Sequence, residues 1–341
     1  MFNPHKLREP RLTGVKRRTP GPVRALGRAA QTLGLQLLAG LPRRTTSASD
    51  AMLITSSARS GSTWLFELLA SDPHVIPVLE PFHPRFNPLF QPYSDRIGHL
   101  EPPTTPDDAR RLAQLIQEVY AGRQLNRWSA TVLPRHRLLT GSRILVKEVF
   151  INRALWWMKG VQSVPTVLLV RHPCAVVESM LRAPMEWHEW PQEGIASALT
   201  LTLAQLDEEL PVGGVPTDQV GLLAALWAVE TRAAITALRG ERESWMVFYE
   251  DLVHDPVGMA HAVGCRLGLY ALRFDADRPS RSTRAPSPFD SKGALGNWRS
   301  RLSGEAVAAI VDTAHAFGVR AYTDRLEPER TEIDGMAMIG P

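Results

Sequence analysis

The chain has 341 residues, of which 44% are hydrophobic and 22% charged, with a formal net charge of +4. This composition is typical of a folded globular protein and excludes a disordered, collagen-like or disulfide-rich chain. Cys174 and Cys265 are the two cysteines and supply no disulfide framework, so we expect a reducing compartment and a cytoplasmic protein.

Residues 1–48 are expected to form a basic arm. Residues 1–50 carry ten Lys or Arg and two acidic residues, a balance of +8, so residues 51–341 carry −4. The amphipathic segment 25–41 is interrupted by polar residues and falls short of the ~18 apolar residues of a membrane span. It suits a helix packed on the body, a helix that binds a membrane surface or a partner, or a processed targeting segment.

The charges of this arm are not interleaved with aromatic residues, and the arm contains no nucleic-acid recognition motif. We therefore expect no nucleic-acid partner. A basic segment of this kind favours, at most, peripheral contact with an anionic membrane.

Residues 49–330 are expected to form one domain, followed by a flexible tail at 331–341. Apolar runs predict strands at 51–55, 75–79, 143–149, 166–170 and 245–248. Helical periodicity predicts helices at 63–70, 106–121, 154–158, 175–181, 195–210, 219–238, 257–267 and 304–316. This alternation indicates an α/β fold with a central parallel sheet flanked by helices, in which ligands lie beyond the carboxyl ends of the strands.

A turn of small residues joins the first predicted strand to the first predicted helix. The turn and the start of the helix consist of Arg59, Ser60, Gly61, Ser62, Thr63 and Trp64. Unpaired N–H groups and the positive end of the helix dipole make such a turn suitable for a phosphate or sulfate. It is not a Walker A loop, because its cation is an arginine placed two residues before the glycine.

A second strand-to-helix corner has a similar character. The predicted strand 166–170 ends at Arg171, a proline follows at 173, and Ser179 lies on the next helix. A guanidinium and a hydroxyl placed in this way suit one phosphate held from two sides. Taken alone, the same residues are also compatible with an ordinary corner and a surface serine.

The two corners together carry a family resemblance. The sequences RSGSTW at 59–64 and VRHPCAVVES at 170–179 closely resemble the paired phosphate loops of sulfotransferases that use 3′-phosphoadenosine 5′-phosphosulfate (PAPS). FYEDL at 248–252 and KGALGNW at 292–298 are similar to two further segments of that family, although Ser291 stands where the family has an arginine. The motifs are closest in style to the tyrosylprotein, carbohydrate and bacterial members.

This resemblance implies a P-loop NTPase-like three-layer fold and a role for each matched residue. The loop 59–63 is expected to hold the 5′-phosphosulfate, with Trp64 beside the adenine, and Arg171 and Ser179 are expected to hold the 3′-phosphate. Further cofactor contacts are expected from Tyr249, Lys292 and Gly293. The expected co-substrate is PAPS and the product adenosine 3′,5′-bisphosphate, with no metal required.

Three residues are expected to carry the chemistry. Arg59 and Lys147 are the candidate cations, and Glu80 is the candidate general base, with a raised pKa if it is partly buried. LVKEVF at 145–150 and the position of Glu80 resemble segments of tyrosylprotein sulfotransferases. His83 is the rival base. The alternative reading of Lys147 is an ion pair with a nearby carboxylate, and that of Glu80 is a pairing with Arg85 or a cap on the turn.

The acceptor is expected to be a hydroxyl group on a carbohydrate, a tyrosyl or phenolic group, or a small alcohol. His83, Trp187 and Trp190 are the candidate contacts for it, although a tryptophan-anchored loop packed on the body is equally compatible with the sequence. Two other functions remain open: a P-loop kinase or NTPase that uses ATP with Mg²⁺, and a catalytically inactive PAPS-fold binding protein.

Overall fold

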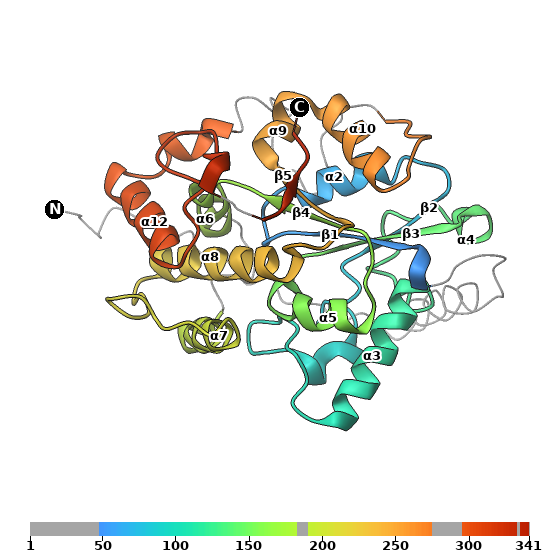
Figure 1. Ribbon diagram of the computed structural model, residues 1–341, viewed down its shortest axis with the longest axis horizontal. Coiled ribbons are helices and arrows are strands. Elements are labelled where there is room, and N and C mark those ends of the chain that lie inside the picture. Colours follow the sequence, from blue (N-terminus) through green and yellow to red (C-terminus); the bar gives the residue numbers. More distant parts are fainter. Residues whose placement is uncertain (1–47, 183–189, 275–294, 333–334, 341) are drawn as a thin grey trace, which may run out of the picture.

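The computed structural model describes residues 48–182, 190–274, 295–332 and 335–340. Its centre is a six-stranded parallel sheet with the order β2-β3-β1-β4-β5-β6 (Figure 1). The strands are β1 (Ala51–Thr55), β2 (Val75–Leu79), β3 (Arg143–Glu148), β4 (Thr166–Val170), β5 (Ser244–Phe248) and β6 (Ala337–Met338).

Helices cover both faces of this sheet (Figure 1). On one face, a single apolar core joins the sheet to α2 (Ser62–Leu69), α9 (Tyr249–His254) and α10 (Pro256–Arg266). On the other face, a larger core joins it to α3 (Pro106–Tyr120), α5 (Leu155–Val161), α6 (Pro173–Arg182), α7 (Gln192–Gln205), α8 (Gln219–Leu238) and α12 (Gly304–Ala316). The expected α/β fold, a central parallel sheet flanked by helices on both faces, is confirmed.

The alternation of side chains along each strand explains the two cores. In β1, Leu53 belongs to the larger core and Ile54 to the smaller one, because successive strand residues point to opposite faces. All five residues of β1 are buried, as expected for a parallel strand covered on both sides. The 20-residue helix α8 is long and apolar enough for a membrane span, but 78% of its most apolar window is buried inside the protein. It is therefore packed as a core helix.

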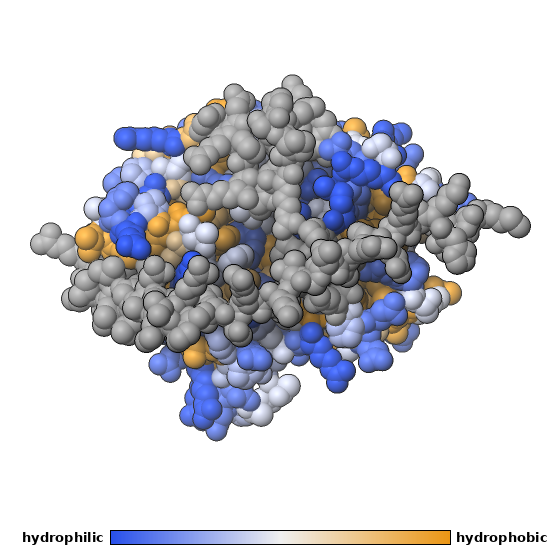
Figure 2. Space-filling model, turned by 180° about the vertical axis from the view of Figure 1, so that it is seen from behind, coloured by the Kyte–Doolittle hydropathy of each residue, from blue (hydrophilic) through white to orange (hydrophobic). Residues whose placement is uncertain are grey.

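The structure differs from the sequence prediction at the C-terminus. Within the segment 331–341, expected to be a flexible tail, Ala337–Met338 forms the edge strand β6, and Ile339 N–H donates to the carbonyl of Met246. The segment 80–105, for which the sequence predicts neither a helix nor a strand, contains a 3-10 helix, η3 (Pro88–Tyr93). The arm at 1–47 lies outside the described residues. On the face shown in Figure 2, hydrophilic and hydrophobic described residues lie interspersed.

Candidate active site

The predicted site segments meet at one edge of the sheet, beyond the carboxyl ends of the strands. Glu80 follows β2, Lys147 lies at the end of β3, and the loop 56–61 follows β1. Arg171 follows β4, and Tyr249 follows β5. Because the strand order is β2-β3-β1-β4-β5, these segments follow one another across the sheet in that order.

The loop after β1 is built to approach an anion. Gly61, at the N-terminal cap of α2, has a φ of +90°, and the cap makes no side-chain hydrogen bond. A Cβ at this glycine would lie 2.3 Å from the Tyr249 ring, so the loop needs glycine here. The Ser60 hydroxyl is buried and finds no hydrogen-bond partner among the described residues. Ser62 is anchored by Ser56 across 2.8 Å.

The two corners predicted to bind phosphate are in direct contact. Arg59 Nε donates to Ser179 Oγ across 3.1 Å. Arg171 donates to the carbonyl oxygen of Arg59 across 3.0 Å, and its guanidinium lies 4.4 Å from the centre of the Tyr249 ring. Trp64 packs edge-on against Tyr249, with ring centres 6.3 Å apart. The structure thus brings these residues into one basic, aromatic-lined group, which we call the anion clamp (Arg59–Trp64, Arg171, Ser179 and Tyr249).

A buried polar network that the sequence did not predict supports this clamp. The Glu250 carboxylate accepts a hydrogen bond from the backbone N–H of His172 across 3.0 Å and one from the Tyr322 hydroxyl across 2.9 Å. His172 Nε2 faces the carbonyl oxygens of Thr323 and Arg325 at 3.0 and 2.9 Å. Burial lowers the pKa of His172 to about 4 and raises that of Glu250 to about 7. The network therefore holds the backbone directly after Arg171 in place.

Glu80 and Lys147 form a close pair beside the clamp. Lys147 Nζ lies 2.5 Å from Glu80 Oε1, and the side chains of Lys147 and Glu80 are 3% and 15% exposed. Burial opposes ionisation, but the charge and hydrogen bond of Lys147 hold the pKa of Glu80 below its ordinary value. The expected raised pKa of Glu80 is therefore wrong, because the sequence did not reveal its partner. The carboxylate that pairs with Lys147 is therefore Glu80 itself.

The candidate acceptor residues meet around Phe150. His83 lies 4.5 Å from the Phe150 ring and His99 lies 5.1 Å from it, measured between ring centres. Trp190 packs edge-on against His99 at 5.4 Å. Burial lowers the pKa of His83 to about 4. Two of the three predicted acceptor residues, His83 and Trp190, therefore belong to one group of contacting rings, which we call the aromatic row (His83, Phe150, His99 and Trp190). The third, Trp187, lies outside the described residues, as do Lys292 and Gly293.

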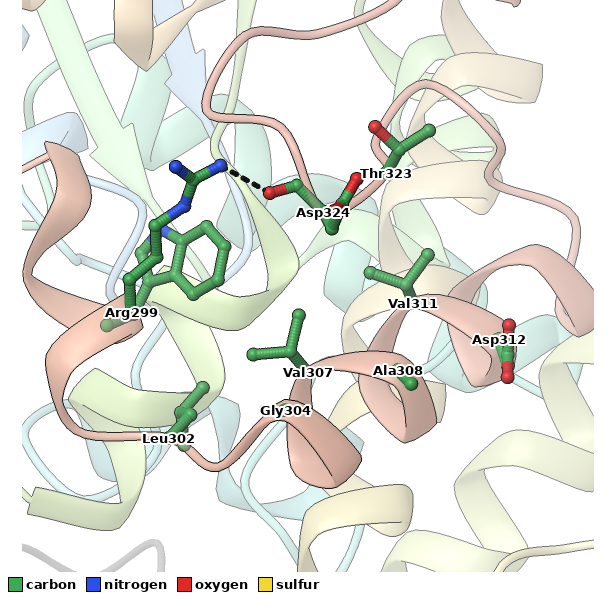
Figure 3. A pocket seen from close by; sticks show the side chains of 10 residues that line it. Arg299, Leu302, Gly304, Val307, Ala308, Val311, Asp312, Thr323 and Asp324 are labelled. Carbon is green, nitrogen blue, oxygen red and sulfur yellow. Dashed lines mark hydrogen bonds between the residues drawn. The ribbon is translucent and has the colours of Figure 1, made fainter.

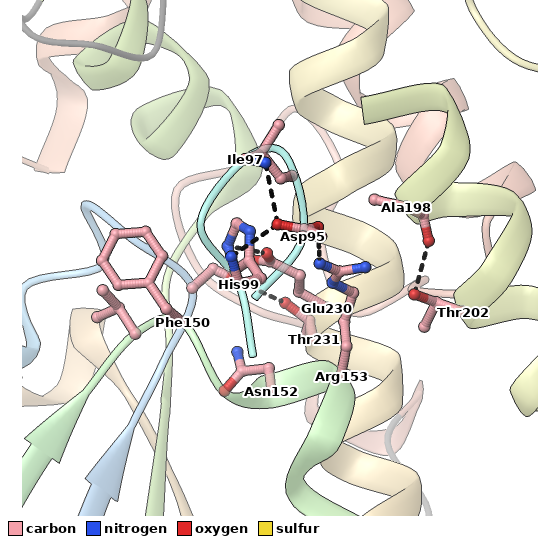
Figure 4. A network of polar contacts seen from close by, with 12 residues as sticks. Asp95, Ile97, His99, Phe150, Asn152, Arg153, Ala198, Thr202, Glu230 and Thr231 are labelled. Carbon is pink, nitrogen blue, oxygen red and sulfur yellow. Dashed lines mark hydrogen bonds and ion pairs between the residues drawn. The ribbon is translucent and has the colours of Figure 1, made fainter. Parts of the chain in front are cut away.

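A second buried network joins the end of β1 and the loop after it to the residues around His99; Figure 4 shows its part around Asp95, His99, Arg153 and Glu230. Thr55, at the end of β1, donates to Asn152 across 2.5 Å, and the next residue, Arg153, pairs with Asp95. Ser57 lies 3.4 Å from Thr231 Oγ1, and the preceding Glu230 lies 2.7 Å from His99 Nε2. The consecutive residues Asn152 and Arg153 therefore connect the end of β1 with the segment that carries His99. Glu230 and Thr231 connect the loop after β1 with the same segment.

A pocket of about 690 Å³ lies elsewhere, against α12. Val307, Ala308 and Val311 line it from the helix, and Arg299 donates to the backbone of Asp324 across its rim (Figure 3). None of the predicted site residues that the structure describes lines it. Trp298, which also lines the pocket, stacks on His172 with ring centres 4.6 Å apart. Among the described residues, no group of three His, Cys, Asp or Glu side chains is placed to hold a metal.

No protein-family model and no curated protein matches the chain. Solved structures do resemble the chain, and two sulfotransferases are among them. The sulfotransferase domain from the curacin biosynthetic pathway is 14% identical, with a TM-score of 0.41 over 80% of this chain and 98% of that one. The sulfotransferase from Alicyclobacillus acidocaldarius is 16% identical, with a TM-score of 0.34 over 80% and 97%. Retinol dehydratase, solved with retinol and PAP, is 16% identical, with a TM-score of 0.37 over 81% and 83%.

Proposed function

We propose that this chain is a PAPS-dependent sulfotransferase that transfers a sulfuryl group to the hydroxyl of a carbohydrate, phenol or small alcohol. The observation that carries the proposal is the order of groups along the sheet edge. A carboxylate paired with a lysine, Glu80 and Lys147, stands next to a clamp in which Arg59, Arg171 and Ser179 come together. A base and a fixed cation therefore lie beside a site suited to a nucleotide with two anionic ends.

The clamp fits such a nucleotide in its residue chemistry. The Ser60 hydroxyl is a buried group without a partner in the described part of the chain, and an anionic oxygen would satisfy it. The cap of α2 at Gly61 makes no side-chain hydrogen bond, and a helix N-terminus of this kind suits an anion. Trp64 and Tyr249 place two buried aromatic rings against the clamp arginine Arg171 and against each other. When bound, PAPS supplies the sulfuryl group that is transferred.

The chemistry then follows from the positions of the charged groups. The Glu80 carboxylate takes the proton of the acceptor hydroxyl as the acceptor oxygen bonds to sulfur and the bond from sulfur to the bridging phosphate oxygen breaks. Lys147 stabilises the charge that develops on that oxygen, and Arg59 holds the anion in line. The pairing with Lys147 also keeps Glu80 ionised, and therefore able to accept a proton, at neutral pH.

The donor is tested by incubating the purified full chain with ³⁵S-labelled PAPS and panels of carbohydrates, phenols and alcohols, and in parallel with γ-labelled ATP and Mg²⁺. We expect a sulfated acceptor, identified by mass, and no phosphorylated one. Transfer from ATP would support a kinase instead. Tight binding of adenosine 3′,5′-bisphosphate without transfer to any acceptor would support an inactive binding protein.

The base is tested with Glu80→Gln, which keeps the shape of the side chain and removes its charge. Loss of a general base typically lowers kcat by about 10²–10⁴-fold, so we expect a fall in that range with nucleotide affinity retained. His83→Gln is the matched variant. If Glu80→Gln turns over normally and His83→Gln does not, the role of base passes to His83.

A further inference from the structure

Glu148 is a buried carboxyl group next to the catalytic pair, and the chemistry above does not use it. It ends β3, directly after Lys147, and is 0% exposed. Because consecutive strand residues point to opposite faces, Lys147 and Glu148 leave the sheet on opposite sides. The lysine reaches Glu80, whereas the glutamate turns toward the larger core.

The contacts of Glu148 are with backbone. Its Oε2 accepts the N–H of Phe82 across 2.9 Å, and its Oε1 accepts those of Val149 and Phe150 across 2.8 and 3.3 Å. The described residues offer it no ion pair at salt-bridge distance. Burial, together with the nearby charge of Glu80, raises the pKa of Glu148 to about 8. Such a buried acid costs stability, which its hydrogen bonds only partly offset.

The segment that Glu148 holds is strained. Glu80 has a φ of +44°, which is rare for a residue with a side chain, and it is followed by a proline, which further restricts it. Strain of this kind persists only where the surroundings enforce it. Here the Glu80 N–H donates to the Lys147 carbonyl across 2.7 Å on one side of the turn. The bond from Phe82 to Glu148 fixes the other side.

We propose that Glu148 is a positioning residue whose carboxyl oxygens hold the 80–82 turn in the conformation that directs Glu80 to Lys147. The same carboxyl group accepts the backbone N–H of Phe150, whose ring contacts both His83 and His99. Glu148 thus fixes the position of the proposed base, Glu80, relative to the aromatic row. This inference rests on the proposed role of Glu80 as the base.

Glu148→Gln and Glu148→Asp test this inference. The glutamine has one oxygen acceptor in place of two, and the aspartate is one methylene too short to reach both Phe82 and Phe150. Because a displacement of about 1 Å at a reacting group can cost 10²-fold, we expect kcat to fall about 10–100-fold in both variants. The dissociation constant for adenosine 3′,5′-bisphosphate should stay within twofold, since neither variant touches the clamp.

Glu250→Gln is the matched control. Glu250 is also buried and also accepts a backbone N–H, but it supports the residue next to Arg171. We expect this control to weaken nucleotide binding more than it lowers kcat at saturating nucleotide. A purely structural Glu148 would lower the melting temperature while leaving kcat per nucleotide-binding site within twofold of the parent, and that result would overturn the inference.

The failure of this inference can be separated from that of the proposed function. If Glu80→Gln keeps normal turnover, the assignment of the base is wrong, whatever the Glu148 variants do. If Glu80→Gln is inactive and both Glu148 variants are fully active, the base stands and the positioning role of Glu148 is refuted.

Discussion

Gly61→Ala is the most direct perturbation of the anion clamp. The glycine has a φ of +90°, and an added Cβ would lie 2.3 and 2.5 Å from two carbons of the Tyr249 ring. Both distances are shorter than real Cβ contacts, so the ring must move. Because Tyr249 lies under the Arg171 guanidinium and packs against Trp64, its displacement would disturb the clamp on two sides.

The cost of this substitution has two parts. An L-residue in the left-handed region costs about 1–2 kcal/mol, and forcing an extra carbon into a packed site costs about 1–3 kcal/mol. Gly240→Ala isolates the first part, since Gly240 has a φ of +77° and no described atom lies within 4 Å of the place its methyl group would take. The difference between the two variants, about 1–3 kcal/mol, corresponds to roughly 5–150-fold in affinity if it falls on the nucleotide site.

Two measurements check this prediction: the unfolding free energy of each variant, and calorimetric titration with adenosine 3′,5′-bisphosphate. We expect both variants to lose stability, and only Gly61→Ala to lose nucleotide affinity. Should Gly61→Ala bind the nucleotide as tightly as Gly240→Ala does, the contact between the loop and Tyr249 does not shape the clamp, and the reasoning fails.

Two further predictions concern pH. Lys147→Met leaves Glu80 buried without its cation, so the pKa of Glu80 should rise and the acid limb of the kcat profile should move to higher pH; an unmoved limb contradicts the assignment of Glu80. His172, with a folded pKa of about 4 against 6.5 for the ordinary group, binds fewer protons folded than unfolded between these values. Stability should therefore fall as pH drops from 6.5 to 4, by about 3 kcal/mol from this group, and His172→Gln should remove that part of the slope in urea unfolding.

Much of the fold was predictable because its signals are local. The strands β1, β2 and β4 lie where their apolar runs predict them, and α8 and α12 have the predicted bounds. The edge strand β6 was missed because two residues carry no periodicity, and their pairing with β5 is set by tertiary contact. The clamp residues were predicted from motifs, and the structure brings the described ones together.

The supporting residues were not predictable for a different reason. Glu148, His172 and Glu250 lie inside or beside predicted motifs, but their partners are distant in sequence: Glu148 is 66 residues from Phe82, and Glu250 is 78 from His172. No local pattern indicates such a pairing. The wrong sign for the pKa of Glu80 has the same origin, since burial alone favours the neutral acid and only the contact with Lys147 reverses it.

The strand order also constrains how an acceptor must reach the site. Neighbouring strands lie about 4.8 Å apart, so Glu80 after β2 stands about 10 Å, or two strand spacings, from the loop after β1. Lys147 on β3 lies between them, in register with Ile54 on β1 and Leu79 on β2. A sulfuryl group held over the β1 loop would therefore have Lys147 beside it and Glu80 on the side away from Arg171. If the proposed function is correct, the nucleotide lies over β1, β4 and β5, and the acceptor hydroxyl approaches from the β2 edge, past His83 and Phe150.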